Sequence, residues 1–220
     1  MLRDPILASR IEGGQPVPLL VWRADGPLRA VSSGPLGGGV GVRRWVLNAT
    51  VPMSYDRDDP AAHLAALAAD LALDGPGVGL LTGVDVTEVV ARTDSGVRAW
   101  VTVGLGTPVP AAAPAAGALT QRVGTVNIVV YVPARLADSA LVNAVATATE
   151  AKTQAIGELG LPGTGTPTDA VTVLCPVDGP DAAYGGPRST WGAPLARAVH
   201  AAVRAGGERP VVPWSDRLTG

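Results

Sequence analysis

The sequence predicts an α+β fold, a single layered domain with a mixed β-sheet and about three helices packed against it. Its 220 residues suit one ordinary domain. Apolar residues make up 47% of the chain and charged residues 16%, which is enough to bury a large core and argues against disorder. Hairpin signals are mixed with strand–helix–strand units, which is typical of α+β layers. We therefore assign residues 1–220 to one domain, to which residues 1–30 contribute the least evidence.

Extended segments account for most of the expected elements. Each is rich in β-branched or large apolar residues and is bounded by Gly, Pro, Asp or Ser. A turn at residues 24–27 (ADGP) separates the first two segments, and Asp94-Ser95-Gly96 predicts a hairpin later in the chain. The expected strands cover residues 17–22, 28–32, 44–51, 78–84, 86–92, 97–105, 125–132 and 170–174.

Three segments carry helical patterns. The first begins at Pro60, after two aspartates, and has an apolar stripe at Leu64, Leu67 and Leu71. The second covers residues 138–159 and the third about 194–205, and the Pro/Ala/Gly-rich stretch 107–118 is expected to be an exposed loop. Two strand–helix–strand segments, one containing Asn48 and one containing Asn127, suggest an internal duplication.

Composition excludes several kinds of partner. A formal charge of −2 without a basic stripe argues against nucleic acid. The single cysteine suits a reducing compartment, and the charged N-terminus does not resemble a signal peptide. No stretch approaches the roughly 20 apolar residues that would span a bilayer. We expect a cytoplasmic protein without a membrane partner, and the sequence leaves oligomer formation open.

The helix over residues 138–159 contains two candidate catalytic residues. Helical spacing places Leu141, Val142 and Ile156 on one apolar face, with Lys152 near its middle and Glu150 on the opposite, polar side. A lysine in an apolar stripe has to extend its ammonium to solvent, pair with an acid, or lose its charge. Lys152 is therefore either a structural residue or a proton-transfer group in a cleft. Glu150 is a solvated acid unless the helix is covered on both faces, in which case it is a candidate for proton transfer.

The flanking segments add further candidates. Asn127 lies in an otherwise apolar strand, where its amide needs hydrogen-bond partners, because an unpaired buried amide costs about 1–3 kcal/mol. The loop TGTPTDA at residues 164–170 combines three hydroxyls with a carboxylate, and its backbone amides could bind the oxyanion of amide hydrolysis. It is equally an ordinary threonine-rich turn. We expect Asn127, Lys152 and loop 164–169 to converge on one cleft.

Cysteine and histidine chemistry is not favoured. Cys175 could join Glu150 and Lys152 as an amidase nucleophile, but a lone cysteine on an apolar strand is far more often part of the core. His63 and His200 lack metal-ligand spacing, so we expect no metal site and no cofactor.

The chain resembles the adenosylcobinamide amidohydrolase family. The resemblance is densest over residues 124–205, in GTVN (124–127), ALVNAVATATEAKTQA (140–155), TGTPTDA (164–170) and YGGPRSTWGAPLARAVHAAV (184–203). Weaker similarity includes SSGPLGGG (32–39), VLN (46–48), VGLLTGV (78–84) and VTVGLGTPV (101–109). It implies hydrolysis of the amide that joins the corrin ring's propionyl side chain to aminopropanol, with adenosylcobyric acid as the product, in corrinoid (vitamin B12) salvage.

Within that reaction the residue roles are our own hypothesis. Proton transfer is assigned to Glu150 or Lys152, and oxyanion stabilisation to the loop. The nucleophile is either water or a threonine. The full assignment is catalytic Glu150, Lys152, Thr164, Thr166 and Asp169, and substrate-binding Asn48, Asn127, Gly165 and Thr168. The alternative functions are a corrinoid-binding carrier or sensor without catalysis, and an amidase with another substrate.

Overall fold

A computed structural model describes residues 1–114, 124–210 and 214. Three α-helices and a mixed eight-stranded sheet confirm the predicted α+β class. The predicted loop 107–118 is described only as far as residue 114, and the remainder of it lies outside the described residues. The elements are β1 (Ile6–Glu12), β2 (Gln15–Ser32), β3 (Gly39–Thr50), α1 (Pro60–Asp70), β4 (Gly77–Thr82), η1 (Val86–Glu88), β5 (Val90–Asp94), β6 (Val97–Val103), β7 (Val126–Tyr131), α2 (Asp138–Glu158), β8 (Ala170–Pro176) and α3 (Gly192–Gly207).

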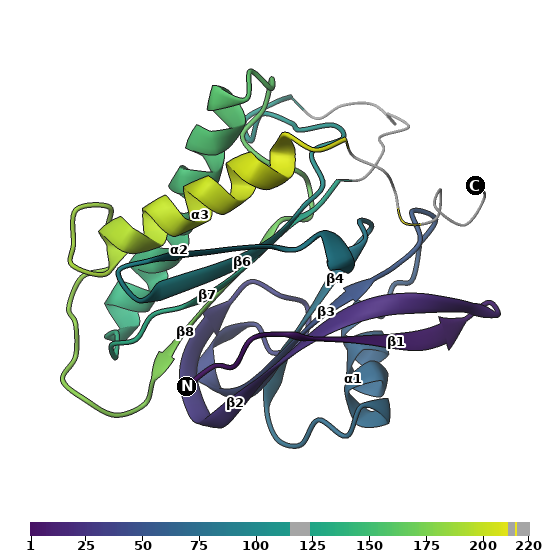
Figure 1. Ribbon diagram of the computed structural model, residues 1–220, viewed down its shortest axis with the longest axis horizontal. Coiled ribbons are helices and arrows are strands. Elements are labelled where there is room, and N and C mark those ends of the chain that lie inside the picture. The colour runs from purple at the N-terminus through teal and green to yellow at the C-terminus, as the bar shows by residue number, and fades with distance from the viewer. Residues whose placement is uncertain (115–123, 211–213, 215–220) are drawn as a thin grey trace.

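The sheet has the strand order β4-β3-β2-β8-β7-β6-β5, and β1 pairs with the first half of β2. Among the strands of the described residues, only β3–β4 and β7–β8 are parallel pairs, and each is joined through a helix. Helices α2 and α3 cover one side of the β6–β8 half, whereas α1 lies on the far side of the β2–β3 half (Figure 1). The two strand–helix–strand units suggested by the sequence are therefore present.

Three apolar clusters show that the sheet halves face each other. One cluster joins α2 and α3 to the outer face of β6–β8, and another joins α1 to the outer face of β2 and β3. The third contains residues from both halves, including Trp22 and Val46 from one and Trp100 and Val129 from the other. Because side chains alternate along a strand, Asn48 shares the inner face with Val46, and Asn127 shares it with Val129.

Several local predictions need correction. β1 was not expected, and residues 17–32 form one strand rather than two, because a bulge between Arg23 and Leu28 absorbs the expected turn. Residues 86–92 divide into the short helix η1 and the start of β5. The Ser95-Gly96 hairpin is confirmed, since both residues have positive φ angles between β5 and β6.

The buried face of α2 also differs from the prediction. Val142 is 60% exposed, whereas Leu141 and Ile156 are buried as expected. The remaining buried positions are mostly alanines, which allow α2 to pack closely against α3 and β8. Lys152 lies on this face, with 6% of its surface exposed.

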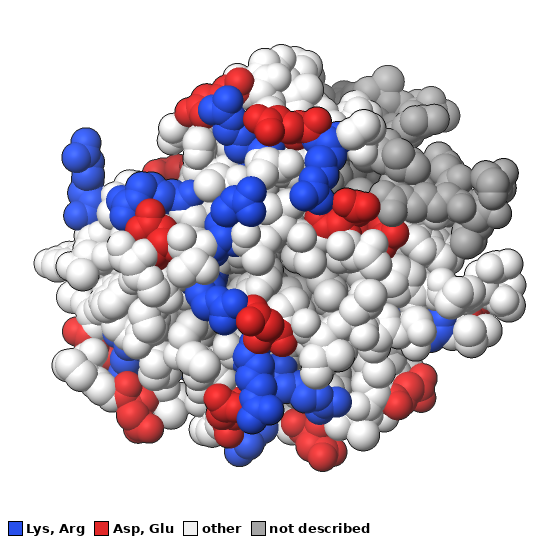
Figure 2. Space-filling view, viewed as in Figure 1, with Lys and Arg blue, Asp and Glu red and all other residues white. Residues whose placement is uncertain are grey.

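The outer surface is mixed in charge. On the face drawn in Figure 2, basic and acidic residues are interspersed among neutral ones. None of the helices in the described part of the chain combines the length and apolar character needed to cross a membrane.

Candidate active site

The two strand–helix–strand units bring their asparagines together inside the molecule. Asn48 in β3 and Asn127 in β7 are each 1% exposed, although 79 positions separate them in the chain. The Asn127 Nδ2 donates hydrogen bonds to Asn48 Oδ1 at 2.9 Å and to the Leu81 carbonyl at 2.8 Å. Asn48 Nδ2 in turn donates to Thr102 Oγ1 at 3.1 Å. These bonds connect the facing halves of the sheet.

One polar atom of the Asn48–Asn127 pair lacks a hydrogen-bond partner in the described part of the chain. Asn127 Oδ1 is withdrawn from solvent and has no hydrogen-bond partner among the described residues. The orientation of its amide is determined by the Leu81 carbonyl, which can only accept a hydrogen bond. A buried amide oxygen without a donor costs about 1–3 kcal/mol, so Asn127 keeps an unused acceptor at this position.

Asn127 lies on a cavity of about 350 Å³. One wall comes from the segment between β3 and α1, and includes Pro52, Met53, Tyr55 and Arg57. Another part of the lining comes from residues at the ends of β4, β7 and β8. The lining is otherwise mostly apolar, with a few polar side chains, as is usual for small-molecule sites.

Two threonines lie just before the first residues of β7 and β8. Thr125 and Thr168 both line the cavity, and their hydroxyls are 2.7 Å apart. The Thr168 hydroxyl also donates to the Gly124 carbonyl at 3.2 Å. If Thr168 donates to Gly124, Thr125 donates to Thr168, and both hydroxyl protons are used within the protein.

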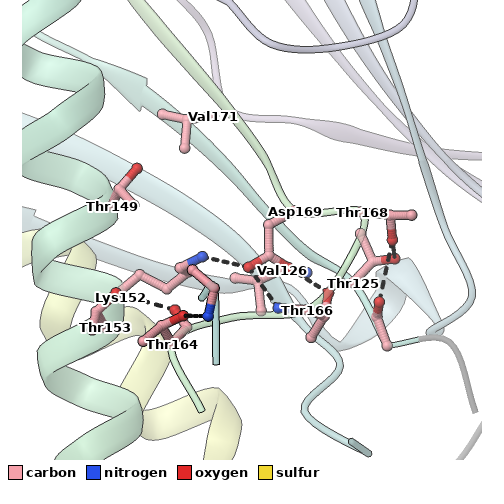
Figure 3. A network of polar contacts seen from close by, with 12 residues as sticks. Thr125, Val126, Thr149, Lys152, Thr153, Thr164, Thr166, Thr168, Asp169 and Val171 are labelled. Atoms are coloured by element: carbon pink, nitrogen blue, oxygen red, sulfur yellow. Dashed lines mark hydrogen bonds and ion pairs between the residues drawn. The ribbon is translucent and has the colours of Figure 1, made fainter. Parts of the chain in front are cut away.

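Behind these threonines lies a network centred on Asp169 (Figure 3). Its carboxylate pairs with the ammonium of Lys152 and accepts hydrogen bonds from the Val126 amide at 2.8 Å, the Thr166 amide at 3.0 Å and the Thr166 hydroxyl at 2.5 Å. The side chains of Lys152 and Asp169 are only 8% and 11% exposed. Because Val126 and Asp169 are the chain neighbours of residues that line the cavity, the network determines where the cavity residues lie.

Gly165 and Thr164 complete the loop. A Cβ on Gly165 would overlap both Lys152 Nζ and Asp169 Oδ2, so a larger residue there would displace the ion pair. The Thr164 hydroxyl accepts a hydrogen bond from the Ala111 amide at 2.9 Å and contacts the Val109 carbonyl at 3.3 Å. Thr164 thus attaches loop 164–169 to the segment that follows β6.

The predicted residues therefore form two neighbouring groups rather than one. Lys152, Thr166 and Asp169 lie on the α2 side of β7 and β8, whereas Asn127 and Thr168 line the cavity on the inner face. The Thr164 and Thr166 amides donate to Val109 and Asp169, so both are used within the protein. Glu150 is exposed on α2 and does not line the cavity.

Sequence reasoning missed the residues of the other cavity wall. Tyr55 and Arg57 line the cavity, and the Tyr55 hydroxyl lies 3.1 Å from Nδ1 of His63 in the first turn of α1. His63 is 8% exposed. The sequence did offer one indication of these residues, because His63 lies next to Leu64 in the apolar stripe of this helix.

The remaining titratable candidates lie elsewhere. Cys175 is fully buried, its Sγ accepts a hydrogen bond from the Leu136 amide at 3.4 Å, and burial raises the pKa of its thiol. His200 pairs with Glu158 near the surface, at 2.9 Å. Within residues 1–114, 124–210 and 214, no three His, Cys, Asp or Glu side chains gather as metal ligands would.

Comparison with known proteins identifies the family. The model of the adenosylcobinamide amidohydrolase family matches residues 5–211. A protein named adenosylcobinamide amidohydrolase from Methanosarcina mazei is 31% identical over 190 residues, which cover 82% of this chain and 90% of that protein. A protein of the same name from Halobacterium salinarum is 36% identical over 132 residues, covering 57% of this chain and 56% of that protein. The chain belongs to the adenosylcobinamide amidohydrolase family.

Proposed function

We propose that the chain hydrolyses the amide between the corrin ring's propionyl side chain and aminopropanol in adenosylcobinamide. Adenosylcobyric acid and aminopropanol are the products, and the reaction serves corrinoid salvage in the cytoplasm. Membership of the family supports the choice of substrate. The observation that carries the choice of site is that Asn127, which lines the cavity, has a side-chain oxygen without a hydrogen-bond partner among the described residues.

The polar groups of the cavity suit this side chain. Asn127, Thr125 and Thr168 offer acceptors, and an aminopropanol amide brings two donors, its amide N–H and its hydroxyl. A buried acceptor that meets a substrate donor discriminates strongly against analogues lacking that donor. The scissile amide would then lie beside Asn127 and the Thr125–Thr168 pair.

The size of the cavity indicates how the rest of the substrate is placed. A volume of about 350 Å³ is near the lower end for a small-molecule site, enough for one side-chain arm but not for the macrocycle. The corrin ring would therefore lie outside, near the apolar lining residues Pro52, Met53 and Pro60. Lys152 and Asp169 hold the threonine wall in place rather than contacting the amide.

Turnover of adenosylcobinamide by the purified protein tests this proposal. Release of aminopropanol and adenosylcobyric acid, followed by mass spectrometry, is the expected result. Thr168→Val should raise KM about tenfold, because it removes one hydrogen bond worth about 1.4 kcal/mol. Thr93→Val, which removes an exposed hydroxyl on β5, is the matched control and should behave like the wild type.

Two results would contradict the proposal. Corrinoid binding without any product would favour the carrier or sensor alternative. Turnover that is indifferent to Thr168→Val in a folded variant would move the site away from this cavity.

A further inference from the structure

Tyr55, which lines the same cavity as Asn127, forms a pair with His63. Tyr55 lines the cavity, and its hydroxyl lies 3.1 Å from His63 Nδ1. Their rings stack with centroids 5.6 Å apart and planes at 20°. His63 belongs to the first turn of α1 and is almost fully buried, and its contact with Tyr55 connects its imidazole to the lining of the cavity.

The surroundings favour a neutral pair. Burial lowers the pKa of His63, and the guanidiniums of Arg57 and Arg10 lower it further, against smaller opposing effects of Glu12 and Asp59. Burial raises the pKa of the Tyr55 hydroxyl. At neutral pH the phenol therefore keeps its proton, and the imidazole can accept one at Nδ1.

We propose that Tyr55 and His63 are the proton-transfer unit of the amide hydrolysis, with Tyr55 the catalytic residue that touches the substrate and His63 the base behind it. This assignment rests on the proposed function of the cavity. A water molecule attacks the amide carbon, its proton passes to the Tyr55 oxygen, and the Tyr55 proton passes to His63 Nδ1. The C–O bond forms, and the electron pair of the carbonyl moves to its oxygen.

Collapse of the tetrahedral intermediate reverses the relay. The carbonyl re-forms and the C–N bond breaks. Tyr55 then gives its proton to the departing nitrogen and recovers one from the His63 imidazolium. The proton taken from water thus ends on aminopropanol, and the pair returns to its starting state without any further reactant.

Other proton carriers are less suitably placed. The Lys152 ammonium and the Asp169 carboxylate are paired with each other on the opposite side of β7 and β8. His200 interacts with Glu158 on the outer surface of the α2–α3 layer. Of the two imidazoles in the chain, His63 alone contacts a residue that lines the cavity.

The test compares Tyr55→Phe and His63→Gln with the matched controls Tyr184→Phe and His200→Gln, in single turnovers of adenosylcobinamide. The first two variants should slow the chemical step by about 100-fold or more. Their corrinoid affinity should change little, because the interaction is made only in the transition state. The control variants should retain the wild-type rate.

The pH profile separates catalysis from a structural role. The wild-type rate should fall as pH drops through the lowered pKa of His63, because a protonated imidazole cannot accept the proton. His63→Gln should lose this acidic limb along with most of its rate. A folded Tyr55→Phe variant within threefold of the wild-type rate would overturn the assignment and leave the proposed function intact.

Wild-type protein that releases no aminopropanol would instead overturn the proposed function, and this assignment with it. If Tyr55→Phe fails to fold, the proposal is tested instead by measuring the wild-type rate in mixtures of H2O and D2O. A two-proton relay predicts a curved dependence on the deuterium fraction, and a linear one would contradict it.

Discussion

Lys152 forms its ion pair with Asp169 beneath the strand ends that carry the cavity threonines, with both side chains largely withdrawn from solvent. The only lysine of the chain thus has its compact ammonium group in a buried ion pair, whereas the other 16 basic side chains are arginines. Of the three alternatives open to a lysine in an apolar stripe, the structure shows pairing with an acid.

Lys152→Met is expected to lower the free energy of unfolding by about 3–5 kcal/mol, because it leaves the charge of Asp169 without its counter-ion. Lys152→Arg should recover only part of this loss, since a planar guanidinium would have to fit against Gly165. Urea unfolding at pH 7 measures the free energy of unfolding of both variants. Arg92→Met, on the exposed edge strand β5, is the control and should change stability by less than about 0.5 kcal/mol. A Lys152→Met variant as stable as this control would show that the pair contributes nothing.

Gly165→Ala should destabilise the protein by about 1–3 kcal/mol, because the added methyl group displaces the Lys152–Asp169 pair. Gly157→Ala provides a contrast within α2, since a Cβ there meets nothing within 4 Å. That variant should gain about 0.5–1 kcal/mol from helix propensity. Thermal unfolding of the two variants should therefore give shifts of opposite sign. Equal shifts would contradict the crowding inferred at Gly165.

The sequence predicted elements whose signals are local. Pro60 after two aspartates places the start of α1, and Ser95-Gly96 places the hairpin, because both depend on backbone preferences of adjacent residues. The turn expected at residues 24–27 was wrong because pairing with β3 on both sides of the bulge keeps β2 continuous. Tertiary pairing overrode a good local turn signal at this point.

Contacts between the candidate residues could be predicted where these residues are close in sequence. Lys152 in α2 and the loop of Asp169 belong to one strand–helix–strand unit, so their association could be expected from the order of elements. The Asn48–Asn127 contact depends on how the two halves of the sheet pack against each other, and so does the position of Tyr55 at the cavity. No local sequence pattern predicts this packing. His63 was set aside because it lacked metal-ligand spacing, although a buried imidazole can serve without a metal.

Cys175→Ser should keep turnover within about tenfold, which corresponds to about 1.4 kcal/mol of activation free energy. The thiol is fully buried beside Leu136, and its raised pKa disfavours the thiolate that a nucleophile requires. Single-turnover kinetics of the folded variant measure this. A loss of a thousandfold would instead make Cys175 the nucleophile of a cysteine amidase.

Dialysis against a strong chelator should leave activity unchanged. The chemistry proposed for the cavity uses a phenol, an imidazole and a water molecule, and none of its steps calls for a Lewis acid. The rate before dialysis, after dialysis and after addition of zinc measures the effect. Activity lost on chelation and restored by zinc would show that carboxylates or His63 act as ligands.

Glu150→Gln decides between the assignment made from sequence and the placement seen in the structure. The family-like segment TATEAK suggested proton transfer by Glu150, and such a group typically contributes about 10²–10⁴-fold to the rate. Its side chain, however, is on the exposed face of α2, while the cavity opens on the inner face of the sheet. We therefore expect Glu150→Gln to retain the wild-type kcat within about twofold, like the control Glu208→Gln on the surface beyond α3. A hundredfold loss of kcat in folded Glu150→Gln, with normal corrinoid affinity, would place the reacting amide on the outer face of α2 and remove the cavity from the mechanism.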